Sequence, residues 1–434
     1  MTISIAPTKH FHLDSSSIAP DKSISHRCAI FSLLCEKPSF VENYLLGEDT
    51  LNSLKIAQKL GLSVKEHTKG LELIPPKNGI EEPKEILECG NAGTAIRLYM
   101  GLLSAQKGLF VLSGDEYLNV RPMGRVAKPL SSIGATIYGR EEGKYAPIVI
   151  VGNPNLQNFT FKSQIPSAQV KSALILAGLF AKETSFYYEE ELSRDHTEKM
   201  LCGMGAKIQS EISNTEVKIK ITPLKEKLKA LEIKVPSDPS SAFFFAVAIA
   251  ITPDSSGVLR NVLLNPTRIE AFKILEKMGV QIEYKITQSA YEDIGDIYLK
   301  APLKLQSVEV SSKISWLIDE LPALAIAMAC AEGESIVKNA KELRVKECDR
   351  IVAVVENLKK CGIEAKELED GFSIIGGEFK KAEVVSFGDH RIAMSFAIAG
   401  LKSGICIKDA EYINISFPNF LNILKEITTL EEKN

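Results

Sequence analysis

The sequence predicts an α/β fold in two domains, built from six copies of one β-α-β-α-β-β repeat of roughly 70 residues. Three observations predict it. A chain of 434 residues is too long for one ordinary core, so two domains are expected. Six Ala-rich stretches are apolar nearly all round, as buried helices are, and they begin near Lys22, Ala92, Ser167, Asp238, Asp319 and Asp389. An amphipathic stretch follows each about 27 to 29 residues later, at the fixed spacing of a repeat.

The second helical stretches begin near Asp49, Arg121, Arg194, Thr267, Lys346 and Phe417. Five of them end with a glycine before an apolar run: KLGLSV, SIGATI, GMGAKI, KMGVQI and KCGIEA. Glycine suits the left-handed position after a helix, and the β-branched residues that follow suit a strand. The sixth stretch reaches the chain end first. Short β-like runs between the two helices of a repeat, such as 109–113 and 335–338, complete the pattern.

Six repeats divide most naturally into three and three. The segment VPSDP, residues 235–239, carries two prolines between the third and fourth repeats, and we place one crossover there. The segment 15–20, before the first repeat, is the other candidate. We therefore expect a first lobe at residues 15–237 and a second lobe at residues 238–434, which residues 1–14 join.

Composition excludes several classes of protein. Apolar residues at 45% and charged residues at 25% are ordinary globular values, and a net charge of −3 gives no global basic field for nucleic acid or anionic lipid. The most apolar run, 242–251, is far shorter than the ~20 residues of a membrane helix. No secretory signal is recognisable at the start, and the eight cysteines form no CxxC pair and no zinc site. We expect reduced thiols and a cytoplasmic protein without bound metal.

The chemically informative residues lie where the helices begin. The first repeat starts DKSISHR and presents Lys22, Ser23 and Arg27, of which Ser23 and Arg27 share one helix face. The free N–H groups and positive dipole end of a helix N-terminus add to such a site for an anion. A capped surface helix uses the same residue types, so this segment alone leaves both interpretations open.

The second repeat begins GNAGTAIR, where Gly93 lets a ligand approach the backbone closely, although such turns often only connect elements. Its second helix starts RPMGR, with Arg121 ahead of Pro122 at a plausible first helical position. An arginine there can bind a carboxylate or phosphate with two hydrogen bonds.

The third repeat supplies SAQVKSA and SRDHTEKM, and with them Ser167, Gln169, Lys171 and Arg194. Hydroxyl and amide donors at a helix N-terminus suit a phosphate. N-capping by Ser167 and Ser193 is the structural alternative.

The fifth repeat is the most densely charged. It supplies Asp319 and Glu320 before a proline, and then the stretch ELRVKECDR with Arg344, Lys346, Glu347, Asp349 and Arg350. The sixth begins FGDHR, placing Asp389, His390 and Arg391 against a very apolar helix. A solvated helix face is the alternative for the fifth repeat. Together, however, four or five repeats aim cations from helix starts, as expected for a cleft that holds a polyanion between two lobes.

In order and spacing, over essentially the whole chain, these residues resemble the EPSP synthase family. The motifs are DKSISHR, GNAGTAIR, RPMGR, SAQVKSA, SRDHTEKM, DELP, RVKECDR and GDHRIAMSF. The forms RPMGRV, SRDHTEKM and FGDHRIAMSF are similar to the class II branch. The resemblance implies the enolpyruvyl transferase fold, an inverted β-prism of two lobes with three βαβαββ repeats each, which close around the substrates.

The implied reaction moves the carboxyvinyl group of phosphoenolpyruvate to the 5-hydroxyl of shikimate 3-phosphate and releases phosphate. No metal or organic cofactor, no nucleic acid and no membrane is expected, and family precedent favours a monomer. The resemblance assigns shikimate 3-phosphate to Lys22, Ser23, Arg27, Ser167, Ala168, Gln169, Arg194, Asp319 and Lys346. It assigns phosphoenolpyruvate to Lys22, Gly93, Arg121, Gln169, Arg350 and Arg391.

The methylene carbon of phosphoenolpyruvate must gain a proton while the shikimate hydroxyl loses one, so an acid and a base are needed at different points. Asp319 matches the family's base. Glu347, with Lys22 nearby, is the best candidate for the proton that reaches the methylene.

Some positions depart from the class I pattern. Leu98 stands where class I has proline, Ser416 where it has a lysine, and Ala168 where it has a phosphate-binding serine. Gly93 stands where some herbicide-tolerant class II enzymes carry alanine, so we expect glyphosate to enter the site.

Three other functions compete. A UDP-N-acetylglucosamine enolpyruvyl transferase would carry a reactive cysteine or aspartate in the second repeat, where this chain has Asp115 but no cysteine. An RNA 3′-terminal phosphate cyclase would need a nucleophilic histidine and a basic RNA surface. A non-catalytic repeat clamp would have no reason to place Asp319, Glu347 and several arginines at equivalent helix starts.

Overall fold

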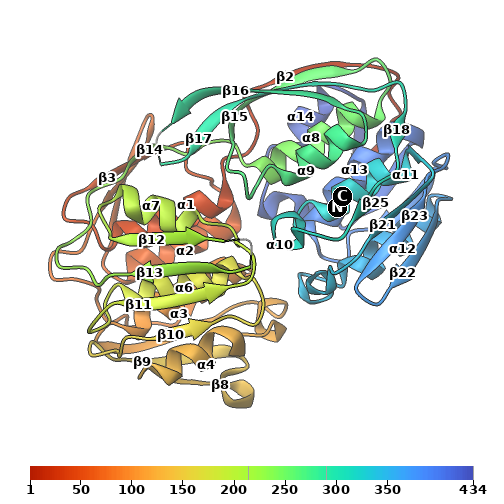
Figure 1. Cartoon of the computed structure of the whole chain (residues 1–434). Helices are drawn as coiled ribbons and strands as arrows, with labels where there is room; N and C mark the ends of the chain where they lie inside the picture. Colours follow the sequence, from red (N-terminus) through yellow and green to blue (C-terminus); the bar gives the residue numbers. More distant parts are fainter. Residues whose placement is uncertain (214, 290, 434) are drawn as a thin grey trace. The chain divides into compact units, whose positions relative to one another are not determined.

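The structure is a computed structural model that describes residues 1–213, 215–289 and 291–433. The chain divides into two compact units: domain 1 is Pro20–Val235, and domain 2 is Met1–Ala19 with Pro236–Asn434. The predicted division lies at residues 14/15 and 237/238. Figure 1 shows the course of the chain through both units.

Domain 1 contains three four-stranded sheets. Their strands, in spatial order, are β14 (Glu232–Lys234), β3 (Ser39–Glu42), β5 (Gly70–Ile74) and β4 (Ser63–His67); β6 (Leu87–Glu88), β7 (Gly108–Ser113), β9 (Tyr145–Gly152) and β8 (Thr136–Gly139); and β10 (Thr160–Lys162), β11 (Ser185–Glu189), β13 (Val217–Ile221) and β12 (Ile208–Ile212). In each sheet the first two strands are parallel and the other neighbours antiparallel.

Domain 2 repeats this arrangement. Its three four-stranded sheets are β2 (His12–Ser15), β15 (Ser256–Leu263), β17 (Asp293–Lys300) and β16 (Gln281–Ser289); β19 (Glu309–Val310), β21 (Glu334–Val337), β23 (Gly371–Ile375) and β22 (Glu364–Leu368); and β24 (Ala382–Val385), β25 (Ile405–Lys408), β1 (Thr2–Ile5) and β26 (Leu430–Lys433). A further pair joins β18 (Leu305–Gln306) to β20 (Ala331–Glu332).

Two first strands are exchanged along the chain. Strand β2 precedes the first helix of domain 1, but it pairs in parallel with β15 of domain 2. Strand β14 precedes the first helix of the fourth repeat, yet it pairs in parallel with β3 of domain 1. Because β1 also completes the sixth repeat's sheet, the first residues of the chain belong to domain 2.

Each repeat contains a buried helix and an amphipathic one. The buried helices are α1 (Lys22–Ser32), α3 (Gly93–Ser104), α6 (Ala168–Gly178), α8 (Pro239–Ile251), α11 (Leu321–Ala329) and α13 (His390–Ser403). The second helices are α2 (Glu48–Lys59), α4 (Gly124–Ser132), α7 (His196–Gly203), α9 (Glu270–Lys277), α12 (Arg350–Lys360) and α14 (Phe420–Lys425). Short helical turns complete the chain: η1 (Leu118–Val120), α5 (Arg140–Gly143), α10 (Ile314–Leu317), η2 (Lys341–Val345) and η3 (Ala410–Ile415).

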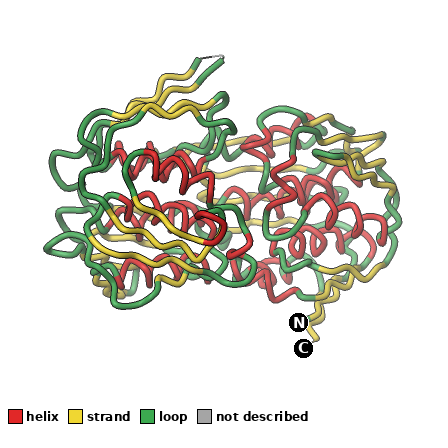
Figure 2. The backbone as a smooth tube through the Cα atoms, turned by 90° about the horizontal axis from the view of Figure 1, so that it is seen from below, coloured by secondary structure: helices red, strands yellow, loops and turns green. Residues whose placement is uncertain are grey.

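Figure 2 shows helices running side by side within each domain, with strands at its outer side. Every residue of α8 and of α11 is buried, as their all-round apolar sequences predict. The five predicted helix-terminating glycines, Gly61, Gly134, Gly205, Gly279 and Gly362, all have positive φ, between 79° and 107°. This conformation turns each second helix into the strand that follows it.

Packing between helices fixes where their N-termini lie. In domain 2, Phe245 of α8 lies 6.0 Å from the ring of Phe417 and 5.4 Å from that of Phe420, so the last repeat packs on the fourth. Burying one such side chain contributes about 1.5–3 kcal/mol. No helix in the described ranges of the chain is long and apolar enough to cross a lipid bilayer.

Candidate active site

The sequence-predicted site residues of domain 1 gather at helix starts. Lys22 is the first residue of α1, Gly93 that of α3 and Ala168 that of α6. Backbone N–H groups in these first turns have no partner further up the helix, and the dipole adds positive potential. Each of the three starts is therefore suited to an anionic group.

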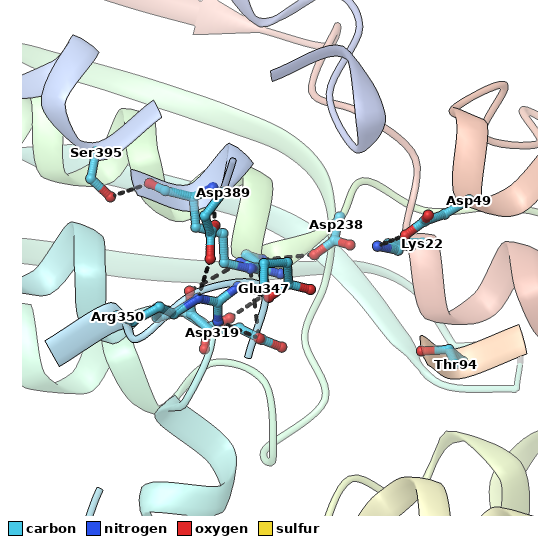
Figure 3. A network of polar contacts seen from close by, with 12 residues as sticks. Lys22, Asp49, Thr94, Asp238, Asp319, Glu347, Arg350, Asp389 and Ser395 are labelled. Atoms are coloured by element: carbon cyan, nitrogen blue, oxygen red, sulfur yellow. Dashed lines mark hydrogen bonds and ion pairs between the residues drawn. The ribbon is translucent and has the colours of Figure 1, made fainter. Parts of the chain in front are cut away.

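Lys22 is held by a carboxylate that the sequence analysis did not select. Asp21 caps α1 by accepting a hydrogen bond from the Ile24 backbone N–H at 2.7 Å. The Lys22 ammonium forms an ion pair with Asp49, which lies in the first turn of α2 (Figure 3). The Asp49 side chain is only 4% exposed, whereas that of Lys22 is 22% exposed. The partly exposed ammonium is thus oriented by a buried carboxylate and remains accessible to a substrate.

Arg27 lies below Lys22 on the same helix and is buried. Its Nε donates to Thr197 Oγ1 at 2.8 Å, and its Nη2 donates to Ser172 Oγ at 3.1 Å. Its Nη1 donates to the Ser23 carbonyl at 3.0 Å. Residues of α6 and α7 therefore fix the Arg27 guanidinium, so a substrate carboxylate would meet a preset donor.

Gln169 connects the starts of α3 and α6. Arg97 Nη1 donates to Gln169 Oε1 at 2.6 Å, and Gln169 Nε2 donates to Thr94 Oγ1 at 3.2 Å. Arg97 also donates from Nη2 to the Pro122 carbonyl at 3.0 Å. These bonds fix the amide orientation of Gln169, which the resemblance assigned to both substrates.

Arg121 lies in a different local structure from the one predicted. It adopts an extended conformation after the turn η1, and α4 begins only at Gly124, so Pro122 is not the first helical residue. Its Nη2 donates to Asn91 Oδ1 at 2.5 Å, which directs the guanidinium back to the GNAG turn. A Cβ added to Gly93 would lie 2.9 Å from Nη1 of Arg97 and 3.1 Å from Nη1 of Arg121. The absence of a side chain at Gly93 therefore makes room for two guanidinium groups.

The start of α6 leaves its cap side chain available. Ser167 is the N-cap residue, half-buried, and its hydroxyl makes no capping hydrogen bond. The alternative of capping by Ser193 is wrong, because Asp195 is the N-cap of α7 and the Ser193 hydroxyl donates to Glu189 Oε2 at 2.8 Å. Arg194 follows, two residues before α7 begins.

Lys171, which the sequence suggested as an anion-binding residue beside Ser167, points into the interior of domain 1. Its side chain is fully buried, and its ammonium lies 3.0 Å from Glu189 Oε1 and 2.9 Å from Glu198 Oε1. Burial lowers the pKa of Lys171, but the two carboxylates outweigh it and raise the pKa overall. The Glu198 pKa is also raised, because burial outweighs the nearby ammonium. Lys171 therefore stabilises domain 1 rather than facing a substrate.

In domain 2, one buried arginine contacts three carboxylates. Arg350 is the first residue of α12 and is 1% exposed. Its Nε donates to Asp389 Oδ2 at 2.7 Å, its Nη2 to Glu347 Oε2 at 2.6 Å and its Nη1 to Asp319 Oδ1 at 3.4 Å (Figure 3). Burial lowers the pKa of Arg350, but the three carboxylates raise it well above its usual range. Of these carboxylates Asp389 is fully buried, whereas Asp319 and Glu347 are 21% and 18% exposed.

Asp319 also contacts a second arginine. Arg391 Nε lies 3.6 Å from Asp319 Oδ1, and Arg391 Nη1 donates to the Asp319 carbonyl at 3.0 Å. Arg391 lies in the first turn of α13, whose cap Asp389 accepts from the Arg391 backbone N–H at 2.8 Å. The structure thus brings Asp319, Arg350 and Arg391 into one cluster, although up to 72 residues separate them in sequence.

Lys346 lies beside this cluster and is half-buried. Burial lowers its pKa to about 8, even though the nearby Asp319 carboxylate acts in the opposite direction. A lysine with such a pKa both attracts an anion near neutral pH and can exchange a proton there. The neighbouring Glu347 is held by Arg350, so its Oε2 has a defined place.

Several members of the site were not selected from the sequence. Asp49, Thr94, Arg97, Ser172 and Thr197 contact the predicted residues directly. Thr94, Arg97, Ser172 and Thr197 lie within the quoted motifs, and Asp49 stands at the start of a second helix, but none of them was assigned a role in the site from the sequence.

Comparison with known proteins gives one consistent result. A family model described as EPSP synthase (3-phosphoshikimate 1-carboxyvinyltransferase) matches residues 15–424. A protein of Nitratiruptor sp. named 3-phosphoshikimate 1-carboxyvinyltransferase is 57% identical over 429 residues, covering 99% of both chains. One of Helicobacter hepaticus with the same name is 56% identical over 434 residues, covering 99% of this chain and 98% of the relative.

Solved structures agree. An EPSP synthase of Acinetobacter baumannii is 38% identical, with a TM-score of 0.87 over 100% of both chains. The enolpyruvyl transferase NikO of Streptomyces tendae is 14% identical, with a TM-score of 0.75 over 100% of this chain and 98% of that one. The second likeness concerns the fold alone.

Proposed function

The chain belongs to the EPSP synthase family, and on that premise we propose how its residues divide the work of the reaction. It is an enzyme of the shikimate pathway that transfers the enolpyruvyl group of phosphoenolpyruvate to shikimate 3-phosphate. Its fold is that of the enolpyruvyl transferases, with six repeats in two domains. The division of labour among the side chains is our proposal.

Domain 1 supplies most of the contacts to shikimate 3-phosphate. The phosphate binds at the start of α6, where Ser167 offers its hydroxyl, Ala168 its backbone N–H and Arg194 its charge. Arg27 and Ser23 take the shikimate carboxylate, and the ring lies against Gln169. This assignment is supported by the uncommitted hydroxyl of Ser167 and by the positive end of the α6 dipole.

Phosphoenolpyruvate brings a carboxylate and a phosphate, and arginines bind both well because their donors match two oxygens at once. Arg121, with the backbone at Gly93, serves from domain 1. Arg350 and Arg391 serve from domain 2, each in the first turn of a helix. Lys22, and Lys346 at its lowered pKa, add the remaining positive charge.

The observation that carries this proposal is the Asp319 cluster. One carboxylate lies 3.4 Å from Arg350 and 3.6 Å from Arg391, so the base and two phosphoenolpyruvate-binding cations occupy one place. We assign the shikimate hydroxyl to Asp319 and Lys346 as well. A carboxylate with 21% of its side chain exposed can accept that proton.

The reaction proceeds by addition and elimination. Glu347, assisted by Lys22, gives a proton to C3 of phosphoenolpyruvate, which makes C2 cation-like. The shikimate oxygen forms a bond to C2 and gives its proton to Asp319. The bond from C2 to the phosphate oxygen then breaks, and C3 returns one proton to Glu347, which completes the enol ether. The leaving phosphate takes up the proton that Asp319 had accepted, so both carboxyl groups return to their starting states. The arginines stabilise the charge that develops on the phosphate.

Equilibrium binding of shikimate 3-phosphate alone, by calorimetry, tests the division between domains. Loss of one hydrogen bond to a charged group costs about 1.5–3 kcal/mol, which is about 10- to 150-fold in affinity. We expect Arg194→Ala to weaken binding by that factor and Arg391→Ala to leave it within about threefold. Arg391→Ala should instead raise KM for phosphoenolpyruvate. The reverse pattern would refute the assignment.

We further infer that glyphosate competes for the phosphoenolpyruvate site, since Gly93 leaves the two arginine guanidinium groups clear. We also infer a monomer that works in the cytoplasm. All eight cysteines are free thiols, which suits a reducing compartment.

A further inference from the structure

We propose that Glu320, held by Ser240 and Arg268, is a positioning residue that fixes the base Asp319 for proton transfer. The inference rests on the role proposed for Asp319 and extends it to a buried network that contacts no substrate. The sequence singled out Glu320 beside Asp319, but the reaction as described gives it no part.

The network is a chain of buried polar contacts within domain 2. Arg268, 1% exposed, donates from Nη2 to Ser240 Oγ at 3.0 Å. Ser240 Oγ in turn donates to Glu320 Oε1. The same Nη2 donates to Asp238 Oδ1 at 2.7 Å, and Asp238 caps α8 by accepting from the Ser240 backbone N–H at 2.8 Å. Ser240 thus accepts one hydrogen bond and gives one, between a buried cation and a buried carboxylate.

These contacts join three helix starts. Ser240 lies in the first turn of α8, Arg268 lies two residues before α9, and Glu320 is the N-cap residue of α11. The Glu320 backbone is also fixed, since its N–H donates to Leu317 O at 2.8 Å and its carbonyl accepts from Leu324 N at 2.9 Å. Because both its side chain and its backbone are held, Glu320 leaves Asp319, the preceding residue, little freedom to move.

Arg268 and Arg350 make comparable contacts. Arg268 lies two residues before the second helix of its repeat, and Arg350 begins the second helix of its own. Each bonds an aspartate that caps a buried helix: Arg268 bonds Asp238 of the same repeat, and Arg350 bonds Asp389 of the next repeat. Around Arg350 the carboxylates of Asp319 and Glu347 are partly exposed. Around Arg268 the partners are at most 7% exposed, and Glu320 is 1% exposed. The carboxylates of Asp319 and Glu347 beside Arg350 are therefore accessible to a substrate, whereas the buried network around Arg268 is not and can act only as a support.

Asp319 needs such support because its other contacts will change during the reaction. Its carboxylate lies near Arg350 and Arg391, the two cations that would also contact phosphoenolpyruvate. When substrate takes up those donors, the backbone position set by Glu320 remains. A misplacement of about 1 Å can lower a rate by roughly 100-fold, so fixing the backbone of Asp319 should have a measurable effect on kcat.

Steady-state kinetics of four variants, with phosphate release as readout, tests the proposal. Ser240→Ala removes the link between Arg268 and Glu320, and Ser240→Thr restores a hydroxyl. Ser241→Ala is the matched control, since it makes the same change at the next buried position of α8. Asp319→Asn removes the proposed base itself. Circular dichroism and thermal melting establish that each variant is folded.

We expect Ser240→Ala to lower kcat on the order of tenfold or more while both KM values stay within about threefold. Ser240→Thr should recover most of kcat, and Ser241→Ala should match the wild type. If the contact between Ser240 and Glu320 only stabilised the fold, Ser240→Ala would lower the melting temperature without lowering kcat selectively at constant KM. If Ser240→Ala does not fold, Glu320→Ala, which removes the acceptor of the Ser240 hydroxyl, is expected to show the same loss of kcat.

A folded Ser240→Ala enzyme with kcat within twofold of wild type would overturn the inference, as would an equal loss in Ser241→Ala. Full turnover by Asp319→Asn would instead refute the role proposed for Asp319. If kcat falls in Asp319→Asn but not in Ser240→Ala, the positioning role of Glu320 is refuted and the role of Asp319 stands.

Discussion

A single methyl group at Gly93 should weaken phosphoenolpyruvate binding through two arginines. The Cβ of Gly93→Ala would lie 2.9 Å from Arg97 Nη1 and 3.1 Å from Arg121 Nη1, where ordinary contact begins at 3.4 Å. The Arg97 group must therefore move by about half an ångström and the Arg121 group by somewhat less. Neither is free to do so without loss, because Arg97 bonds Gln169 at 2.6 Å and Arg121 bonds Asn91 at 2.5 Å.

The size of the expected rise in KM follows from the hydrogen bond that Arg121 would make to phosphoenolpyruvate. A hydrogen bond to a charged group contributes about 1.5–3 kcal/mol, and a partial displacement of Arg121 should forfeit the lower part of that range. At about 1.4 kcal/mol per factor of ten, KM for phosphoenolpyruvate should rise about tenfold. The Lys22, Asp319 and Glu347 side chains are untouched, so kcat should stay within a few-fold. Glyphosate, which we place in the same site, should lose affinity as well.

Phosphate-release kinetics at saturating shikimate 3-phosphate measures both constants. Gly124→Ala is the matched control, since Gly124 is also the first residue of a helix and its added Cβ would lie no closer than 3.6 Å to its neighbours. An unchanged KM for phosphoenolpyruvate in Gly93→Ala would refute the reasoning, and so would an equal rise in Gly124→Ala. Complete turnover by the wild type in millimolar glyphosate would refute the placement of the inhibitor.

Three further predictions concern charge. The pKa of Lys346 is about 8 rather than its ordinary 10.5, so in the free enzyme its charge is present below pH 8 and lost above it. Calorimetry should therefore show that the affinity for shikimate 3-phosphate falls as the pH rises through 8. The Lys346→Arg variant, which keeps its charge, should show a smaller fall. Asp389→Asn removes the buried partner of Arg350 and should destabilise the fold by about 3 kcal/mol in denaturant unfolding, while a loss below about 0.5 kcal/mol would contradict the buried pairing. Asp49→Asn should lower kcat by releasing Lys22, with a melting temperature within a few degrees of wild type; an unchanged kcat would mean that Asp49 does not orient the ammonium.

Much of the fold could be predicted because it repeats. Helix starts recur at a fixed spacing, and glycine is needed wherever a second helix turns into a strand, so both leave marks in a single sequence. The pairing of β14 with β3 leaves none. A strand of three residues carries too little pattern to specify a partner more than 190 residues away in the chain.

The residue types that make up the candidate site could be predicted from the sequence, but most of the contacts between them could not. Arginines at helix starts predicted an anion site, but the sequence could not tell that Arg350 and Arg268 are both 1% exposed, with partly exposed carboxylates around Arg350 and buried ones around Arg268. Lys171 shows the same limit: its type and place suggested a ligand, yet two buried glutamates hold it inside. The hydroxyl partners of Arg27 lie up to 170 residues away, and isolated serines and threonines carry no signal of such contacts.

The most direct test of the account mixes the purified protein with phosphoenolpyruvate and shikimate 3-phosphate and follows phosphate release with mass analysis of the product. We predict release that requires both substrates, a product carrying one added carboxyvinyl group, and loss of turnover in a folded Lys22→Ala variant. Turnover with UDP-N-acetylglucosamine instead, or full activity without Lys22, would contradict the reaction or the site that we describe.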